Sequence, residues 1–165
     1  MNLRIGNGFD AHAFALGRPL VIGGVTIPFG RGLAGHSDAD VLLHAIADAI
    51  LGALALGDLG AHFPDRDPRW KDADSRGILR EVAALASTAQ FRIGNVDATV
   101  IAQVPRLAPY VASMRTNVAA DLGCEIGAVS VKATTTDRLG FAGREEGIAA
   151  LATVLLVAIE ATLGG

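Results

Sequence analysis

The stretch that says most about this chain is Gly35-His36-Ser37-Asp38-Ala39-Asp40-Val41-Leu42-Leu43-His44. A shorter segment near the N-terminus, Asp10-Ala11-His12, complements it, and together the two segments hold three of the four histidines. Imidazoles and carboxylates gathered in this way suit a borderline-soft divalent cation such as Zn²⁺. The first hypothesis from the sequence is therefore a metal site.

A helix is predicted to begin inside the longer stretch. Ser37 is a favourable N-cap with Asp40 at the third helical position, and apolar residues at positions 42, 43, 46, 47, 50, 51 and 54 follow helical spacing. The opposite stripe carries Asp40, His44 and Asp48, which are four residues apart and so share one face. Short acids around a histidine differ from the Lys, Glu and Arg of an ordinary solvated face, so the stripe favours a functional role.

Asp10 and His12 lie at positions i and i+2, which puts both side chains on the same face of an extended segment. With His44 they would give three protein ligands and an open position, as in catalytic zinc sites. The alternative is that Asp10 caps a turn and His44 is a hydrogen-bonded core residue. For the three residues together we favour the metal site. His36, just before the helix, could be an ordinary loop residue or could hold a phosphate near the helix amides.

The composition predicts one globular domain over residues 1–165. The chain is 51% hydrophobic with a net charge of −3, so we expect an aliphatic core and no nucleic-acid surface, which would need clustered Lys and Arg. The most apolar stretch, 148–159, is too short to span a bilayer. The single Cys124 fits a reducing compartment, and the first residues do not resemble a signal peptide. We therefore expect a cytoplasmic protein with no membrane segment.

The remaining pattern predicts an α/β fold. The expected strands are 3–9, the two arms of a hairpin over 20–29 that turns on Gly23-Gly24, 94–104 and 128–133, and the further helices are about 74–89 and 107–122. The stretch 146–161 is compatible with a helix or with a buried strand, and periodicity does not decide between them. A long polar loop over 57–74 has the length of loops that tend to be functional.

Two segments late in the chain could contact phosphate. The first, Lys132-Ala133-Thr134-Thr135-Thr136-Asp137, follows a predicted strand. Its threonines are explained by β-propensity alone, but their hydroxyls could also line an oxyanion site with Asp137 available to a second cation. The second, Gly140-Phe141-Ala142-Gly143-Arg144-Glu145-Glu146-Gly147, matches neither the P-loop nor the dinucleotide fingerprint, so it predicts no nucleotide fold.

Taken together, these segments resemble the 2-C-methyl-D-erythritol 2,4-cyclodiphosphate synthases of the non-mevalonate isoprenoid pathway, from about Arg4 to about Leu163. Any one segment is a weak match, whereas their order and spacing along the whole chain are highly specific. The matching segments are Arg4–Phe14, His36–Val41, His44-Ala45, Ala55–Gly60, Phe63–Asp65, Ala73–Arg76, Asn95–Asp97, Ile101–Gln103, Val131–Thr136 and Leu139–Phe141.

The resemblance implies an α/β (α+β) domain with a mixed four-stranded sheet and helices packed on one face, of the chorismate-mutase-like trimeric fold. It implies that the C-terminal stretch is a strand, and that a homotrimer shares its active sites between subunits. The implied enzyme is a phosphorus–oxygen lyase: the 2-phosphate of 4-diphosphocytidyl-2-C-methyl-D-erythritol 2-phosphate attacks the β-phosphorus, expelling CMP and closing the 2,4-cyclodiphosphate. Since this nucleophile is already anionic, the protein must mainly fold the substrate back and neutralise charge.

The resemblance also assigns roles to residues. Asp10, His12 and His44 would bind Zn²⁺, His36 and Thr135 would stabilise the transition state, and a second Mg²⁺ or Mn²⁺ on the diphosphate would have Asp137 as its candidate ligand. The implied substrate-binding residues are Asp10, His12, His36, Ser37, Asp58, Leu59, Gly60, Phe63, Pro64, Asp65, Arg66, Asp67, Ala102, Gln103, Val104, Pro105, Arg106, Leu107, Ala108, Thr134, Thr135, Thr136, Asp137, Phe141 and Arg144.

Three residues depart from the family pattern. Asp137 replaces the usual Glu, Glu145 replaces a glycine and adds a charge near the expected threefold axis, and Asp72 replaces a frequent glycine. In the family, the Arg144 region with Phe9 and Phe141 lines an apolar central cavity able to hold an isoprenoid diphosphate, and the sequence leaves open whether this chain does so. A metal-dependent phosphohydrolase and a non-catalytic metal-binding trimer are the competing functions.

Overall fold

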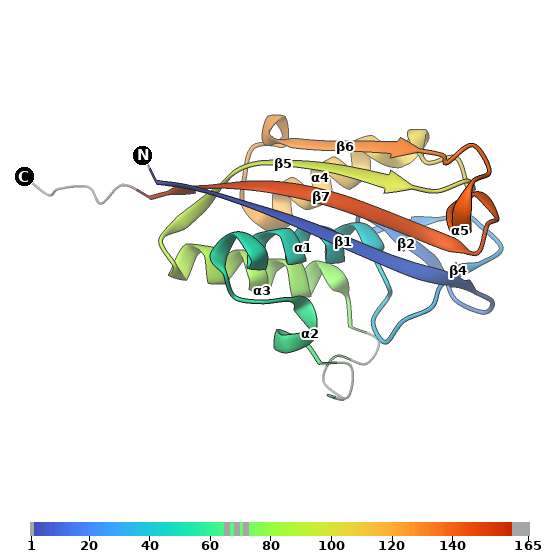
Figure 1. Cartoon of the computed structure of the whole chain (residues 1–165), viewed down its shortest axis with the longest axis horizontal. Coiled ribbons are helices and arrows are strands. Elements are labelled where there is room, and N and C mark those ends of the chain that lie inside the picture. Colours follow the sequence, from blue (N-terminus) through green and yellow to red (C-terminus); the bar gives the residue numbers. More distant parts are fainter. Residues whose placement is uncertain (1, 65–66, 68–69, 71–72, 160–165) are drawn as a thin grey trace, which may run out of the picture.

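The computed structural model describes residues 2–64, 67, 70 and 73–159 (Figure 1). Its centre is a mixed sheet, because β5 and β6 pair in parallel while the other neighbours pair antiparallel. The expected four-stranded sheet is confirmed, with one short strand added at the β1 edge. In spatial order the strands are β4 (Gly32–Leu33), β1 (Leu3–Ala15), β7 (Gly147–Ala158), β5 (Phe91–Ile101) and β6 (Val129–Thr134).

The C-terminal stretch that periodicity left undecided is the long strand β7. It pairs with β1 on one side and with β5 on the other, so that Ala152 stands opposite both Gly8 and Ala98. Its buried residues alternate with Leu151 and Thr153, which are exposed. This period of two is that of a strand with one face on a core. The resemblance implied a strand here, and that prediction is confirmed.

Strand β1 is longer than predicted and contains Asp10 and His12 within it. The prediction ended the strand at residue 9, whereas pairing with β7 continues to Ala13 and pairing with β4 to Ala15. The two partner strands on either side satisfy the backbone groups of this extension. Asp10 and His12 therefore project from a regular strand toward the helical layer, and not from a strand end.

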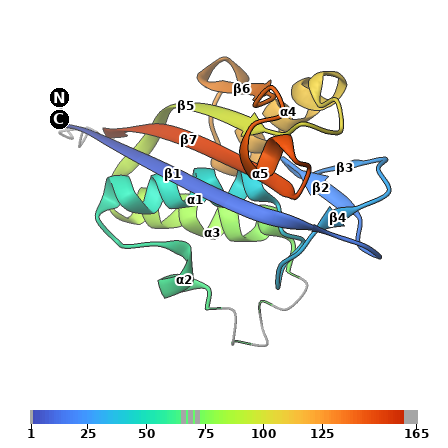
Figure 2. The same cartoon turned by 45° about the vertical axis from the view of Figure 1, so that its right-hand side comes forward.

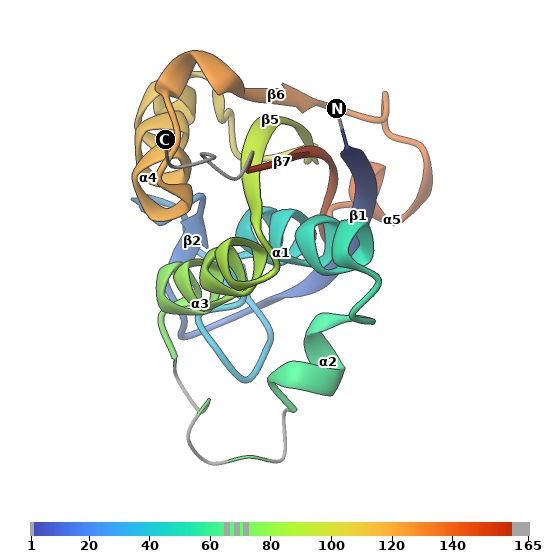
Figure 3. The same ribbon diagram turned by 90° about the vertical axis from the view of Figure 1, so that its left-hand side faces the viewer.

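Three long helices lie on the same side of the sheet, as Figure 3 shows. They are α1 (Val41–Leu54), α3 (Ser75–Thr88) and α4 (Val111–Leu122). Helix α1 packs directly on the backbone of β1: a Cβ at Gly8 would lie only 2.0 Å from the carbonyl oxygen of Ala45, and one at Gly6 only 1.9 Å from that of Ala49. Only glycine permits this approach, and the approach brings His44 of α1 against Asp10 of β1.

Helix α1 begins later than predicted, and its N-cap is Asp40 and not Ser37. The Asp40 carboxylate accepts from Leu43 N at 3.1 Å, as an N-cap does. It also accepts from Gly23 N at 2.9 Å and Gly24 N at 2.7 Å, at the hairpin turn. Ala39 has φ +58°, which interrupts a helix before Asp40. The fully buried Asp40 is thus a structural residue and does not belong to the polar stripe of His44 and Asp48.

The hairpin, α3 and β6 lie close to their predicted positions, whereas β5 begins and ends three residues before its predicted bounds and α4 begins four residues after its predicted start. The hairpin turns on Gly23 and Gly24, which both have positive φ, α3 is capped by Asp74, and α4 ends at Gly123. No helix among the residues that the structure describes is long and apolar enough to cross a membrane. The remaining elements are β2 (Leu20–Ile22), β3 (Val25–Ile27), α2 (Leu59–His62), the 3₁₀ turns η2 (Ala108–Tyr110) and η3 (Ile126–Ala128), and α5 (Gly140–Gly143).

The sheet face opposite the three long helices carries exposed apolar side chains. Ile5 is 72% exposed, Phe9 55% and Leu151 48%. In strand register Phe9 stands opposite Leu151, so these two side chains belong to one patch on adjacent strands. Large contiguous apolar patches on a protein surface mark interaction sites.

Candidate active site

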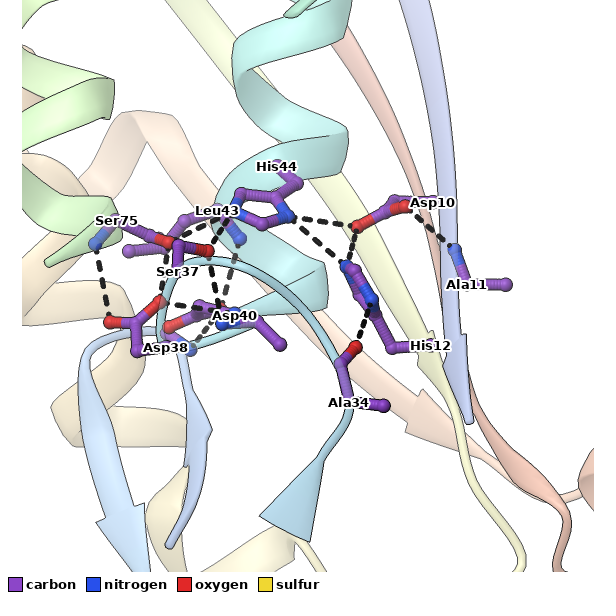
Figure 4. A network of polar contacts seen from close by, with 12 residues as sticks. Asp10, Ala11, His12, Ala34, Ser37, Asp38, Asp40, Leu43, His44 and Ser75 are labelled. Carbon is purple, nitrogen blue, oxygen red and sulfur yellow. Dashed lines mark hydrogen bonds and ion pairs between the residues drawn. The ribbon is translucent and has the colours of Figure 1, made fainter. Parts of the chain in front are cut away.

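Asp10, His12 and His44 converge at the junction of β1 and α1 (Figure 4). Asp10 Oδ2 lies 2.8 Å from His12 Nε2 and 3.0 Å from His44 Nδ1, and the two ring nitrogens are 3.3 Å apart. One ligand atom from each residue lies within 4.8 Å of the others, so the three could hold a single metal ion. The convergence predicted from the strand and helix periodicities is therefore found in the structure.

The orientation of His12 supports a cation between these groups. Its Nδ1 lies 2.7 Å from the carbonyl oxygen of Ala34. A carbonyl oxygen only accepts, so Nδ1 carries a proton, and in the neutral form of the ring the lone pair of Nε2 points toward Asp10. A lone pair and a carboxylate oxygen this close need a shared cation, either a ring proton or a metal ion. One carboxylate oxygen and two imidazole nitrogens form a donor set that fits Zn²⁺ or a similar divalent ion.

The charges of the three groups are coupled. Burial would raise the pKa of Asp10, but hydrogen bonds and positive charge from His12 and His44 hold that pKa well below its usual range. Burial would likewise lower the pKa of His44, but its hydrogen bond to Asp10 and the charge of that carboxylate raise it. Asp10 is therefore an anion near neutral pH, and a metal ion entering the site competes with a proton on His44.

A pocket of about 530 Å³ opens beside these three side chains. Its volume lies within the range of small-molecule sites. The pocket is lined by Asp10, His12, Gly35, His36, Ser37, His44, Asp48, Asp58, Leu59, Gly60, Phe63, Trp70 and Ile78. Most of the residues predicted from the first half of the chain are thus gathered around one space.

Helix α2 forms one wall of the pocket and is fastened to α1. Asp48, one turn beyond His44, accepts from Leu59 N at 2.7 Å, and Asp58 caps α2 by accepting from Ala61 N at 3.0 Å. Burial, together with the negative charges of Asp58 and Asp10, raises the pKa of Asp48. The stripe of His44 and Asp48 thus fixes Asp58, Leu59 and Gly60 next to the possible metal ligands.

The loop that carries His36 is held by Arg18. The Arg18 guanidinium donates to the carbonyl oxygens of Gly35 and Ser37, one on each side of His36. His36 itself is exposed and lines the pocket, where its ring is available to a ligand. The structure thus places His36 beside the candidate metal triad of Asp10, His12 and His44 without making it a fourth member of that group.

Four residues that line the pocket were not predicted as site residues: Gly35, Asp48, Trp70 and Ile78. Asp48 was recognised as part of the polar stripe, and its helical spacing from His44 could have assigned it to the site. Trp70 is the single tryptophan of the chain and contacts Phe63, with ring centroids 4.8 Å apart in an edge-to-face arrangement. Its position in a long polar loop gave a weak signal.

Asp65, Arg66 and Asp72 lie outside the described residues. Pro64 and Asp67, which were also predicted to bind the substrate, are not among the pocket-lining residues, and Asp67 N donates to Pro64 O at 2.9 Å.

The predicted residues 102–108 and 134–137 form a second cluster, which lies toward the far edge of the sheet. Residues 102–108 follow β5, and residues 134–137 start at the last residue of β6, whereas β1 lies next to β4 at the opposite edge (Figure 2). The cluster is internally connected, because Ala102 N donates to Thr134 O at 2.9 Å and Arg138 N to Gln103 Oε1 at 3.1 Å. Among the described residues, the lining of the pocket includes no member of this cluster, nor Phe141 or Arg144.

The departures at Asp137 and Glu145 occupy turns. Glu145 has φ +58°, and its carboxylate accepts from Arg31 at 3.1 Å. The Arg31 guanidinium also lies over the ring of Phe14, 4.4 Å from its centroid. The extra negative charge therefore has a cationic partner within the same chain. Asp137 has φ +50° and lies 3.5 Å from Thr135 Oγ1, which donates to it.

Comparison with known proteins places this site in a family. The YgbB family model matches residues 3–157. A protein of Geobacter metallireducens named 2-C-methyl-D-erythritol 2,4-cyclodiphosphate synthase is 64% identical over 154 residues, covering 93% of this chain and 98% of that protein. A protein of the same name from Burkholderia thailandensis is 61% identical over 157 residues, covering 95% of this chain and 97% of that protein.

A solved structure leads to the same conclusion. IspF of Plasmodium falciparum, in a CDP complex, superposes with a TM-score of 0.85 at 34% identity, covering 96% of this chain and 98% of that chain. Similarity in sequence and in fold thus extends over nearly the whole length of both proteins. The chain with this Asp10, His12 and His44 site belongs to the YgbB family.

Proposed function

We propose that this protein converts 4-diphosphocytidyl-2-C-methyl-D-erythritol 2-phosphate into 2-C-methyl-D-erythritol 2,4-cyclodiphosphate and CMP, acting as a phosphorus–oxygen lyase. The observation that carries the proposal is the convergence of Asp10, His12 and His44 beside a pocket of about 530 Å³. The names of its relatives and the CDP bound to the Plasmodium falciparum protein support a cytidine diphosphate ligand.

We propose that Asp10 Oδ2, His12 Nε2 and His44 Nδ1 are the ligands of a Zn²⁺ or similar divalent ion. When bound, this ion would act as a Lewis acid on a phosphate oxygen and offset part of the diphosphate charge. The net charge of −3 makes such a positive centre useful, because the substrate carries several phosphate groups. A second Mg²⁺ or Mn²⁺ near Asp137 belongs to the same proposal.

The chain's own residues would orient the substrate. The new P–O bond forms between an oxygen of the 2-phosphate and the β-phosphorus, while the bond from that phosphorus to the CMP oxygen breaks. His36 lines the pocket from the loop that Arg18 holds. Its ring would donate a hydrogen bond to a phosphate oxygen that gains negative charge in the transition state. Asp58, Leu59 and Gly60, fixed through Asp48, would hold the other end of the folded substrate.

We propose that the active enzyme is a homotrimer in which the second cluster of one subunit completes the pocket of its neighbour. Two observations support this arrangement. The cluster with Thr135 and Asp137 follows strands at the edge of the sheet opposite His12, and the exposed apolar face with Phe9 and Leu151 is suited to burial between subunits. An isoprenoid diphosphate in a central cavity and a cytoplasmic location stay predictions.

The decisive experiment is incubation with the diphosphocytidyl substrate, Zn²⁺ and Mg²⁺, followed by phosphorus NMR. We expect equal amounts of CMP and cyclic diphosphate. Release of inorganic phosphate without CMP would favour the metal-dependent phosphohydrolase. Bound zinc with no turnover of any cytidine diphosphate ester would favour the non-catalytic trimer. Light scattering coupled to size-exclusion chromatography tests the trimer independently.

A further inference from the structure

The second ring nitrogen of His44 points away from Asp10 and toward two serine hydroxyls. His44 Nε2 lies 2.9 Å from Ser75 Oγ and 3.3 Å from Ser37 Oγ (Figure 4). Ser75 is the first residue of α3 and is only 1% exposed. The closer contact therefore lies between α1 and α3, on the side of the ring opposite the possible metal.

Asp38 determines the direction of this contact. Its carboxylate accepts from the Ser75 hydroxyl, from Ser75 N at 3.2 Å and from Asp40 N at 3.2 Å. A carboxylate only accepts, and a serine hydroxyl has a single hydrogen to donate. With that hydrogen directed to Asp38, Ser75 Oγ offers only lone pairs to His44. His44 Nε2 must therefore be the donor, and in the neutral ring Nδ1 has no proton.

We infer that Ser75 and Asp38 are positioning residues that hold His44 in the tautomer with its proton on Nε2, leaving the lone pair of Nδ1 directed at the metal site. The inference rests on the proposed metal site and adds the groups that prepare one of its ligands. Neither residue is among the pocket-lining residues, so both act through the imidazole.

The two histidines are thus oriented by different devices. The carbonyl oxygen of Ala34 orients His12. His44 is oriented by the Ser75 hydroxyl, which is itself hydrogen-bonded to the Asp38 carboxylate. A backbone carbonyl survives side-chain substitution, but the Ser75 hydroxyl does not. Groups that orient metal-ligating histidines typically change metal affinity by roughly 10–100-fold when they are removed.

The first test measures zinc affinity by competition with a chromogenic chelator. Ser75→Ala is expected to weaken zinc binding by roughly 10–100-fold relative to the unsubstituted protein. Ser87→Ala is the matched control, because Ser87 lies on the last turn of the same helix, is exposed and belongs to no site described above. Its zinc affinity is expected to stay unchanged. Asp38→Asn retains an oxygen that can accept from Ser75 and is expected to lose less affinity than Ser75→Ala.

The second test observes the tautomer directly in metal-free protein labelled with ¹⁵N-histidine. Two-bond proton–nitrogen correlations, at a pH where the rings are neutral, should show His44 with its proton on Nε2, and comparison with His44→Ala identifies its signals. In Ser75→Ala the signals should shift toward a mixture of tautomers, an effect that a merely structural serine would not produce.

Two results would overturn the inference. One is a proton on Nδ1 of His44 in the unsubstituted protein, a result that does not depend on whether any variant folds. The other is a Ser75→Ala protein that binds zinc as tightly as the unsubstituted protein with an unchanged tautomer. Absence of zinc binding by the unsubstituted protein, with His44 still protonated on Nε2, would contradict the proposed metal site and support the positioning role.

Discussion

Replacement of Gly8 by alanine should damage the fold and the candidate metal site together. A Cβ at Gly8 would lie 2.0 Å from the carbonyl oxygen of Ala45, so α1 must move away by about 1.4 Å to restore an ordinary contact of 3.4 Å. Both atoms belong to regular elements, and neither can rotate out of the way. Overpacking of this kind costs about 1–3 kcal/mol, which corresponds to a fall in Tm of roughly 2–12 °C for a chain of this length.

The same displacement affects the candidate metal triad. Ala45 follows His44 directly, so the movement of α1 carries His44 Nδ1 away from Asp10 Oδ2, now 3.0 Å distant. Metal sites hold ligand distances within about 0.2 Å of their ideal values, so we expect weaker zinc binding in Gly8→Ala. Thermal unfolding by circular dichroism and zinc competition measure the two effects, at equal protomer concentration because assembly alters apparent stability.

Gly52→Ala is the matched control on the other side of the same interface. A Cβ there would lie 3.7 Å from the backbone oxygen of Asn7, an ordinary contact. Since alanine is the better helix former, this change should stabilise α1 by about 0.5–1 kcal/mol and leave zinc binding unaltered. The reasoning would be refuted if Gly8→Ala retained the unsubstituted protein's melting temperature and zinc affinity.

Four further predictions follow from the site and its supports. His44→Ala should lose bound zinc and nearly all turnover while keeping the assembly state of the unsubstituted protein, and stoichiometric zinc by elemental analysis would remove His44 from the ligands. In metal-free protein the raised pKa of His44 means that the folded state binds its proton more tightly than the unfolded state. Its contribution to stability is therefore present below the ordinary value of 6.5 and disappears as pH rises through the raised value, a dependence that denaturant titrations should find missing in His44→Ala. His36→Ala should keep zinc but turn over more slowly, and unchanged turnover in the CMP assay would exclude a catalytic role. Asp121→Asn should lower stability by about 1–3 kcal/mol, because the buried carboxylate accepts from Arg76 at 2.7 and 3.0 Å and from Arg80 at 2.9 Å; an unchanged midpoint of urea unfolding would contradict this.

The convergence of Asp10, His12 and His44 could be predicted from the sequence because it depends on two local periodicities. Asp10 and His12 share a face of a strand, and His44 lies on a polar stripe of a helix. The remaining requirement, close contact between these elements, is met by Gly6 and Gly8 on the helix-facing side of β1. The sequence signals for the triad and for its approach thus lie within the first 50 residues.

Other features depend on contacts that local patterns do not contain. The start of α1 is determined by Asp40, whose carboxylate is engaged by amides of the Gly23-Gly24 turn. The C-terminal stretch is alanine-rich, and its strand state follows from pairing with both β1 and β5. A window of adjacent residues identifies neither the turn that binds Asp40 nor the strands that pair with the C-terminal stretch. Only the family resemblance predicted that this stretch is a strand.

The separation of the predicted residues into two clusters has a consequence for inheritance. In the proposed trimer, the metal ligands with His12 and the cluster with Thr135 that serve one substrate come from different polypeptides. A protomer defective only in His12 and another defective only in Thr135 could therefore, when mixed, form some sites in which both contributed halves are intact. Two alleles that each give an inactive protein would then restore part of each other's activity when expressed together. The effect of a mutation in one copy therefore depends on the copy that it assembles with.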